Sequence, residues 1–284
     1  MIVRGTTRVF AILGDPVAHS LSPQMHNAAL QALRIDGIYV PFHVTPENLP
    51  AAMAGVRALQ IAGLSVTVPH KERIIPLLDE IDPAAQRIGA VNTVVNCQGR
   101  LIGYNTDAPG FLCALRETLD FVPGKKNIVM IGAGGAARAA LVALALEGAE
   151  TIVVANRSLD RAVTLTGNYH KVFPDCKMVA TELNADSIDD FLARADLLVN
   201  TSAVGLHGES FPPSLLAALN STAAIFDMVY TRTTTSTPLV RQGKNAGHRV
   251  ADGRSMLLAQ GKEAFALWTG SSPPDEVMEG SLRF

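Results

Sequence analysis

The feature that most constrains the fold is a glycine-rich turn in the stretch VMIGAGGAARAA. The residues from Ile128 to Ile131 have the composition of a buried strand, and a long Ala/Leu-rich segment with a helical pattern follows the turn. Gly132 permits a tight turn, Gly134 permits close approach of a ligand to the backbone, and the small Ala137 permits close packing of helix on strand. Free amide groups at the start of the helix favour an anion, although a purely structural turn is the alternative. The spacing predicts a Rossmann-type unit whose turn binds a dinucleotide pyrophosphate through Gly132, Ala133, Gly134, Gly135 and Ala136.

The end of the next strand, in VVANRSLDR, indicates which dinucleotide is bound. A site for NAD carries an acidic residue there, which accepts from the ribose 2′-hydroxyl. This chain has Asn156, Arg157, Ser158 and Arg161 instead, which offer donors and positive charge to a 2′-phosphate. Asp160 lies beyond the expected position of the acid. The sequence therefore predicts NADP rather than NAD.

Composition limits the other classes of partner. The 284 residues suggest two domains or one large one, and 48% apolar residues provide material for two cores. A formal net charge of −2 gives no electrostatic footprint for nucleic acid, so small molecules are the expected ligands. Cys97, Cys113 and Cys176 are far apart in the sequence and form no CxxC pair, which favours reduced thiols and no metal site. With no signal peptide and no long apolar stretch, we expect a soluble cytoplasmic protein without membrane contact.

The order of segments predicts the fold class. A buried strand over 9–13 precedes a helix that starts near Ser22, the predicted N-cap, with Pro23 as its first helical residue. Further strand and helix patterns alternate, and the first 105 or so residues close with a hairpin whose turn lies at 98–100. A second alternation begins at the glycine turn. This pattern predicts two α/β domains with mainly parallel sheets.

Lys71 stands at the end of a predicted strand, in LSVTVPHKE. Pro69 has no amide hydrogen to give to a sheet and predicts the end of the strand. Functional groups are often placed where strands end, so Lys71 is a candidate for an active site. For a lysine taken alone, a solvated surface position is the alternative. His70 is expected to be structural, and His19 and His26 are expected to be hydrogen-bonded parts of the scaffold rather than ligands.

Nine stretches together indicate a family. In chain order they are GDPVAHSLSPQMHN, SVTVPHKE, GAVNTVV, GYNTDAPGF, GAGGAARAA, ANRS, DMVY, TPL and MLLAQGKEAFALWTG. By their order and spacing the chain resembles the shikimate dehydrogenase family along nearly its whole length. The resemblance implies a substrate-binding catalytic domain over 1–107, completed by C-terminal helices in 251–284. It also implies an NADP-binding Rossmann domain over 108–250, with a cleft between the two domains.

The resemblance further implies the reversible reduction of 3-dehydroshikimate to shikimate with NADPH, in the biosynthesis of aromatic amino acids. Hydride transfer to a ketone leaves an alkoxide that needs a proton, and Lys71 and Asp107 are the implied general acid–base pair. The remaining implied contacts are Ser20, Ser22 and Tyr230 at the substrate carboxylate, Thr67, Asn92, Asp107 and Gln260 at the ring hydroxyls, and Met228 and Gly253 at the cofactor. No metal is implied, and the chain is expected to be a monomer or a homodimer.

The sequence departs from the family at three places, of which the mildest is VNTSAVGLHG, where the family more often has NATSxGM. Ser65 stands where the family has Asn, and Arg232 replaces a proline in a lengthened loop after Tyr230. These departures leave two alternatives open. One is a quinate/shikimate dehydrogenase that uses NAD or NADP, and the other is a non-catalytic shikimate-binding sensor on the same fold.

Overall fold

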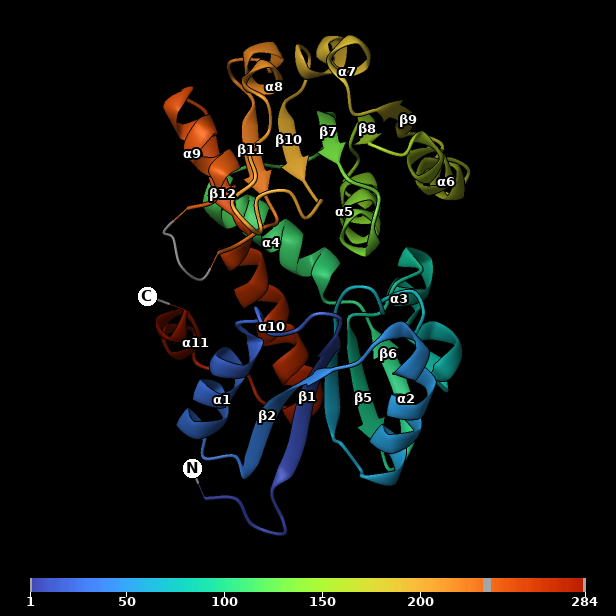
Figure 1. Ribbon diagram of the computed structural model, residues 1–284, viewed down its shortest axis with the longest axis vertical. Helices are drawn as coiled ribbons and strands as arrows, with labels where there is room; N and C mark the ends of the chain where they lie inside the picture. The colour runs from blue at the N-terminus through green and yellow to red at the C-terminus, as the bar shows by residue number, and fades with distance from the viewer. Residues whose placement is uncertain (1, 232–235, 283–284) are drawn as a thin grey trace. The chain divides into compact units, whose positions relative to one another are not determined.

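The computed structural model describes residues 2–231 and 236–282, so Arg232 lies outside the described residues. The chain divides into unit 1 (Met1–Asp107 with Leu257–Phe284) and unit 2 (Ala108–Met256). It leaves unit 1 at the start of helix α4 (Asp107–Leu119) and returns within α10 (Gly253–Thr269). In Figure 1, unit 1 is drawn in blue to teal and red, and unit 2 in green to orange. Each unit is α/β, which confirms the predicted fold class.

The sheet of unit 1 has the strand order β2-β1-β3-β5-β6-β4 (Figure 1). Its pairing is mixed: β1 is parallel to β2 and β3, and β4 is parallel to β6, whereas β5 is antiparallel to β3 and β6. The strands are β1 (Arg8–Gly14), β2 (Gly37–His43), β3 (Gly63–Val66), β4 (Glu80–Ile81), β5 (Thr93–Cys97) and β6 (Arg100–Tyr104). The hairpin predicted around 98–100 is the β5–β6 pair.

Helices cover this sheet with apolar side chains. Met53 and Val56 of α2 are buried with Leu64, Val66 and Val94 of the sheet in one core cluster. The helices of unit 1 are α1 (Ser22–Ala32), α2 (Leu49–Ala58), α3 (Pro83–Ile88), the C-terminal part of α10, and α11 (Asp275–Ser281).

The predicted N-cap role of Ser22 is wrong by one position. Ser22 is the first residue of α1, and Leu21 occupies the cap position without a side-chain hydrogen bond. The reason is that Ser20 Oγ accepts from the Ser22 amide at 3.2 Å, so the preceding serine satisfies this end of the helix. The two serines are thereby held next to each other.

His26, on α1, is buried among aromatic rings. Its ring stacks on Tyr39 with a centroid distance of 4.5 Å and lies 5.1 Å from Trp268 and 6.2 Å from Phe265. Within the described residues neither ring nitrogen has a hydrogen-bond partner. Burial without a partner disfavours the charged imidazole and lowers the pKa of His26 to about 3.

Stability is therefore expected to fall at acid pH because of His26. The unfolded chain takes up this proton near pH 6.5 and the folded chain near pH 3, so the free energy of unfolding decreases as pH falls below about 6.5. The loss is about 1.4 kcal/mol per pH unit in that window. Urea unfolding of His26→Leu at several pH values should show a shallower acid slope than the parent. His170→Gln, which alters an exposed histidine, should keep the parent's slope.

The sheet of unit 2 is wholly parallel, with the order β12-β11-β10-β7-β8-β9 (Figure 1). The chain fills one side from β7 to β9 and then returns to the other side from β10 to β12, so the order reverses between β7 and β10. Such a switch point is where open α/β sheets bind ligands, at the carboxyl ends of the strands. The strands are β7 (Asn127–Ile131), β8 (Thr151–Asn156), β9 (Lys177–Glu182), β10 (Leu197–Asn200), β11 (Ala224–Asp227) and β12 (Arg249–Asp252).

Helices connect successive strands of unit 2. The first of them, α5, begins at the glycine turn and is buried along most of its length, as its Ala/Leu composition predicts. The helices after α4 are α5 (Gly135–Leu146), α6 (Leu159–Tyr169), α7 (Ala185–Leu192), α8 (Pro213–Ala218) and α9 (Pro238–Asn245). In the described part of the chain, every helix is too short or too polar to cross a membrane.

Candidate active site

The loop that carries Lys71 is tied to the loop after β1. The Thr67 amide donates to the Leu13 carbonyl at 2.9 Å, and the Asp15 amide donates to the Val68 carbonyl at 2.9 Å. They lie just beyond the last residue of β3, Val66, so the strand ends three residues before Pro69, which was expected to stop it. The loop is thus fixed at the carboxyl ends of β1 and β3.

The backbone around Lys71 is anchored from two further sides. His70 is fully buried, and its Nε2 donates to the Val44 carbonyl at 2.6 Å. The Val91 amide donates to the Lys71 carbonyl at 2.8 Å. The backbone from which the Lys71 side chain extends is therefore held in place by hydrogen bonds.

Lys71 and Asp107 form an ion pair in unit 1. Lys71 Nζ lies 2.6 Å from Asp107 Oδ2, and the two side chains are 13% and 8% exposed. An exposed ion pair is weakened by water and by the freedom of its side chains. Here both side chains are largely shielded from water and their geometry is fixed. An ammonium carries three donors, so Lys71 keeps donors for a second acceptor while it binds Asp107.

The other carboxylate oxygen of Asp107 is held by Asn92. Asn92 Nδ2 lies 2.9 Å from Asp107 Oδ1, 2.9 Å from Thr106 Oγ1 and 3.4 Å from Gln260 Oε1. Asn92 Oδ1 accepts from the Thr106 amide at 2.7 Å. The sequence-predicted residues Lys71, Asn92, Asp107 and Gln260 therefore lie in one hydrogen-bonded group.

Thr106 belongs to this group although it was not singled out from the sequence. It is 1% exposed and bridges Asn92 and Gln260 through its hydroxyl. Its position in YNTD, next to Asp107, was the signal that could have identified it.

Ser20 lies in the loop after β1, Ser22 is the first residue of α1, and Thr67 directly follows β3. Ser22 is 4% exposed, and its amide contacts the Ser20 hydroxyl as described above. A Cβ added to Gly14 would lie 2.3 Å from Thr67 Cγ2, so glycine is required there for Thr67 to approach. All three are neutral donors or acceptors, which suits a hydroxylated ligand.

The glycine turn of unit 2 has the geometry that a dinucleotide requires. Gly132 has φ of +114°, and a Cβ there would lie 2.6 Å from Thr201 Oγ1. A Cβ at Gly134 would meet no atom of the described chain within 4 Å, so open space lies in front of the turn. Gly134 is also the N-cap of α5, and the first amides of a helix have no partner within the helix, so they are available to an anion. The turn therefore fits a pyrophosphate.

Arg157 follows the end of β8, and Arg161 lies in the first turn of α6. The Gly132 amide donates to the Ala155 carbonyl at 2.9 Å, which places the turn next to the end of β8. Asn156 ends that strand, and its Nδ2 donates to the Ser158 carbonyl at 2.9 Å. Both arginines are exposed and have no ion-pair partner among the described residues, so each can bind a phosphate.

Met228, Tyr230 and Gly253 all belong to unit 2, and Gly253 is the first residue of α10. A Cβ added to Gly253 would lie 2.2 Å from the Met228 carbonyl oxygen, so the two backbones touch. Tyr230 follows β11 in unit 2, whereas Ser20 and Ser22 belong to unit 1. The role of Tyr230 near the substrate carboxylate remains a prediction.

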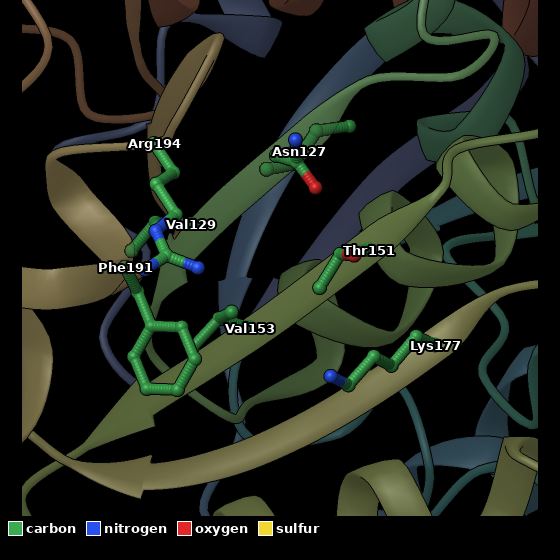
Figure 2. Close-up of a pocket in the computed structure, with 8 residues that line it drawn as sticks. Asn127, Val129, Thr151, Val153, Lys177, Phe191 and Arg194 are labelled. Carbon is green, nitrogen blue, oxygen red and sulfur yellow. The ribbon is translucent and has the colours of Figure 1, made fainter.

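A pocket at the opposite end of this sheet is not part of the predicted site (Figure 2). Its lining includes Asn127, Thr151 and Lys177, which are the first residues of β7, β8 and β9. Phe191 and Arg194, near the end of α7, also line it. The glycine turn lies at the carboxyl ends of the same strands. Among the described residues, no group of three or more His, Cys, Asp or Glu side chains is placed to hold a metal ion.

Family models cover much of the chain. The model described as shikimate dehydrogenase substrate binding domain matches residues 12–94. The model described as shikimate / quinate 5-dehydrogenase matches residues 117–207, and the shikimate 5′-dehydrogenase C-terminal domain matches residues 253–283.

Individual proteins are similar over their full length. The shikimate dehydrogenase (NADP(+)) of Geobacter metallireducens is 48% identical over 278 residues, which cover 98% of this chain and 96% of that protein. The crystal structure of shikimate dehydrogenase from Aquifex aeolicus has a TM-score of 0.88 at 36% identity, with 100% of both chains covered. The Thermus thermophilus shikimate 5-dehydrogenase, solved with NADP(H) and shikimate, has a TM-score of 0.83 at 39% identity, covering 98% of this chain and 99% of that one.

Proposed function

Because the chain belongs to the shikimate dehydrogenase family, we propose that it catalyses the NADP-dependent interconversion of shikimate and 3-dehydroshikimate. The observation that carries this proposal is the Lys71–Asp107 contact of 2.6 Å within a group that also contains Asn92 and Gln260. Unit 1 is assigned to the substrate and unit 2 to the cofactor. The activity serves the biosynthesis of aromatic amino acids.

Lys71 is assigned the proton transfer at the reacting oxygen. In the reductive direction the bound cofactor supplies hydride from C4 of its nicotinamide to the carbonyl carbon of the substrate. Lys71 Nζ gives a proton to the carbonyl oxygen, which becomes the hydroxyl, and takes the proton back in the oxidative direction. Asp107 orients the ammonium through Oδ2, while Asn92 fixes Asp107 through Oδ1.

Neutral side chains are assigned to substrate binding. Ser20 and Ser22 donate to the substrate carboxylate, with Tyr230 near it. A hydroxyl-rich substrate needs several converging donors and acceptors, and these are assigned to Thr67, Asn92, Asp107 and Gln260.

The cofactor is assigned to the carboxyl edge of the unit 2 sheet. The turn of Gly132, Ala133, Gly134, Gly135 and Ala136 would hold the pyrophosphate. The 2′-phosphate is assigned to Asn156, Arg157, Ser158 and Arg161, and the nicotinamide end to Met228 and Gly253. The proposal includes a cytoplasmic location and a monomer or homodimer.

A panel of initial rates tests the proposal. Shikimate and quinate are each offered with NADP⁺ and with NAD⁺, and formation of reduced nicotinamide is followed by absorbance. The highest kcat/KM is expected for shikimate with NADP⁺. Preference for quinate or for NAD⁺ would instead favour the quinate/shikimate alternative. Tight shikimate binding by calorimetry without turnover in any arm would favour the sensor.

A further inference from the structure

Asp227, the last residue of β11, is a buried carboxylate outside the group around Lys71. It is 0% exposed. Its Oδ1 accepts from Asn200 Nδ2 at 2.8 Å and from the Val229 amide at 3.1 Å, and its Oδ2 accepts from Thr237 Oγ1 at 2.6 Å. Both carboxylate oxygens are therefore used in fixed contacts.

The three donors come from three different segments. Asn200 ends β10, and its Oδ1 accepts from Ser202 Oγ at 2.7 Å in the loop that follows. Val229 follows β11. Thr237 is the N-cap of α9, and its hydroxyl also accepts from the Val240 amide at 3.3 Å. Asp227 thus connects the loop after β10, the segment after β11 and the start of α9.

The segment just after Asp227 is fixed on its other side as well. The Met228 amide donates to the Asn200 carbonyl at 2.9 Å, and the Gly253 amide donates to the Val229 carbonyl at 3.2 Å. Arg254 Nη2 donates to the Thr231 carbonyl at 3.3 Å. The backbone after Asp227 is therefore held by hydrogen bonds at Met228, Val229 and Thr231.

Burying the Asp227 carboxylate costs free energy, because its charged form is removed from water. Desolvation, with a smaller contribution from the nearby Asp252, raises its pKa to about 6 against the effect of the three donors. Asp252 faces Asp227 in the β11–β12 register and is accompanied by Arg254, whose Nε lies 3.7 Å from Asp252 Oδ2. Since the folded pKa lies above the ordinary 3.8, stability falls as pH rises through the window between these values. A group with this cost needs a role that an apolar residue could not fill.

We propose that Asp227 is a positioning residue that fixes the Met228–Val229 backbone at the carboxyl edge of the sheet, where the nicotinamide end of the cofactor is assigned. The functional part of this inference rests on the proposed function. The contacts themselves do not, so the two can be tested separately.

Asp227→Asn in the full chain tests this role. The amide keeps the shape and one acceptor oxygen, but its nitrogen cannot accept from the Thr237 hydroxyl. Hydrogen exchange of the peptide that contains 228–230 is expected to be at least about 10-fold faster than in the parent, with the β7 peptide unchanged. Unchanged exchange at 228–230 would overturn the proposal, whether or not the chain turns over shikimate.

Cofactor affinity gives the second readout. Calorimetry with NADP⁺ alone is expected to show Kd raised by about 10-fold in Asp227→Asn, the equivalent of one lost hydrogen bond to a charged group. As pH falls below about 6, where Asp227 gains a proton, Kd should rise more steeply in the parent than in the variant. The 2′-phosphate of NADP⁺ titrates in the same range and contributes equally to both profiles. Equal affinities and equal pH profiles would contradict the positioning role. If the parent itself failed to bind NADP⁺, the proposed function would fail, and the exchange experiment would still decide whether Asp227 fixes the segment.

Two further variants keep the test sharp. If Asp227→Asn does not fold, Thr237→Val is the substitute, because it removes one donor to Asp227 and leaves the carboxylate in place. It should likewise speed hydrogen exchange at 228–230 and weaken NADP⁺ binding. Asp196→Asn is the matched control, because Asp196 accepts from the Asn127 amide at 2.9 Å at the amino end of the sheet. It should leave both exchange at 228–230 and NADP⁺ affinity unchanged.

Discussion

Replacement of Lys71 by alanine is expected to lower kcat by about 10²- to 10⁴-fold, the usual contribution of a positioned general acid–base. The KM for shikimate should change far less, because neutral groups are assigned to hold the substrate. Steady-state rates at saturating shikimate and NADP⁺ measure this effect. Calorimetry with shikimate separates a loss of chemistry from a loss of binding.

Lys126→Ala is the matched control for this variant. Lys126 Nζ also pairs with a carboxylate, Asp196, at 3.3 Å, but it lies at the amino end of β7 in unit 2. Its replacement should leave kcat unchanged. A Lys71→Ala protein with the parent's kcat would show that another group transfers the proton.

The double substitution of Arg157 and Arg161 by alanine is expected to raise the KM for NADP⁺ by roughly 10- to 100-fold. This range corresponds to the loss of about 1.5–3 kcal/mol of hydrogen bonding to a charged phosphate. The KM for NAD⁺ should stay nearly constant, because NAD⁺ lacks the 2′-phosphate. Initial rates with each cofactor at saturating shikimate measure both values.

Arg194→Ala serves as the control for cofactor preference. Arg194 is exposed like the other two arginines, but it borders the pocket at the amino ends of the strands in Figure 2. Its removal should leave both KM values unchanged. Equal increases for NADP⁺ and NAD⁺ in the double variant would mean that the arginines do not read the 2′-phosphate.

Local sequence patterns were sufficient for most of the fold. The strand before Gly132, the glycine turn and the helix after it are confirmed, because each depends on neighbouring residues alone. The mixed strand pairing in the sheet of unit 1 was harder to predict from the sequence. Parallel and antiparallel neighbours depend on which strands meet, and the antiparallel β3–β5 pair joins segments that are separated in the sequence.

The candidate site shows a similar division. Motif matches indicated Lys71, Asn92, Asp107 and Gln260, and the structure links them by hydrogen bonds, while their roles remain predictions. Asp227 was not selected, although DMVY was recognised. Its importance depends on burial and on a donor ten residues further on, Thr237, which no local pattern indicates.

His26 illustrates the limit of residue type as a guide. His26 was expected to be a hydrogen-bonded part of the scaffold. It instead stacks on Tyr39 and lies near Trp268, which comes from the far end of the chain. The hydrogen-bonding expectation was wrong because the surrounding rings are brought together only by the tertiary fold.

The most direct test of Lys71 and Asp107 as one catalytic unit is a double-mutant cycle in kcat with Lys71→Met, Asp107→Asn and the combined variant. Each single substitution should lower kcat by about 10²-fold or more. The double variant should lose little beyond the larger single loss, because residues that act as a unit are strongly non-additive. Losses that multiply in the double variant, or an Asp107→Asn enzyme with the parent's kcat, would contradict a shared role for the two side chains.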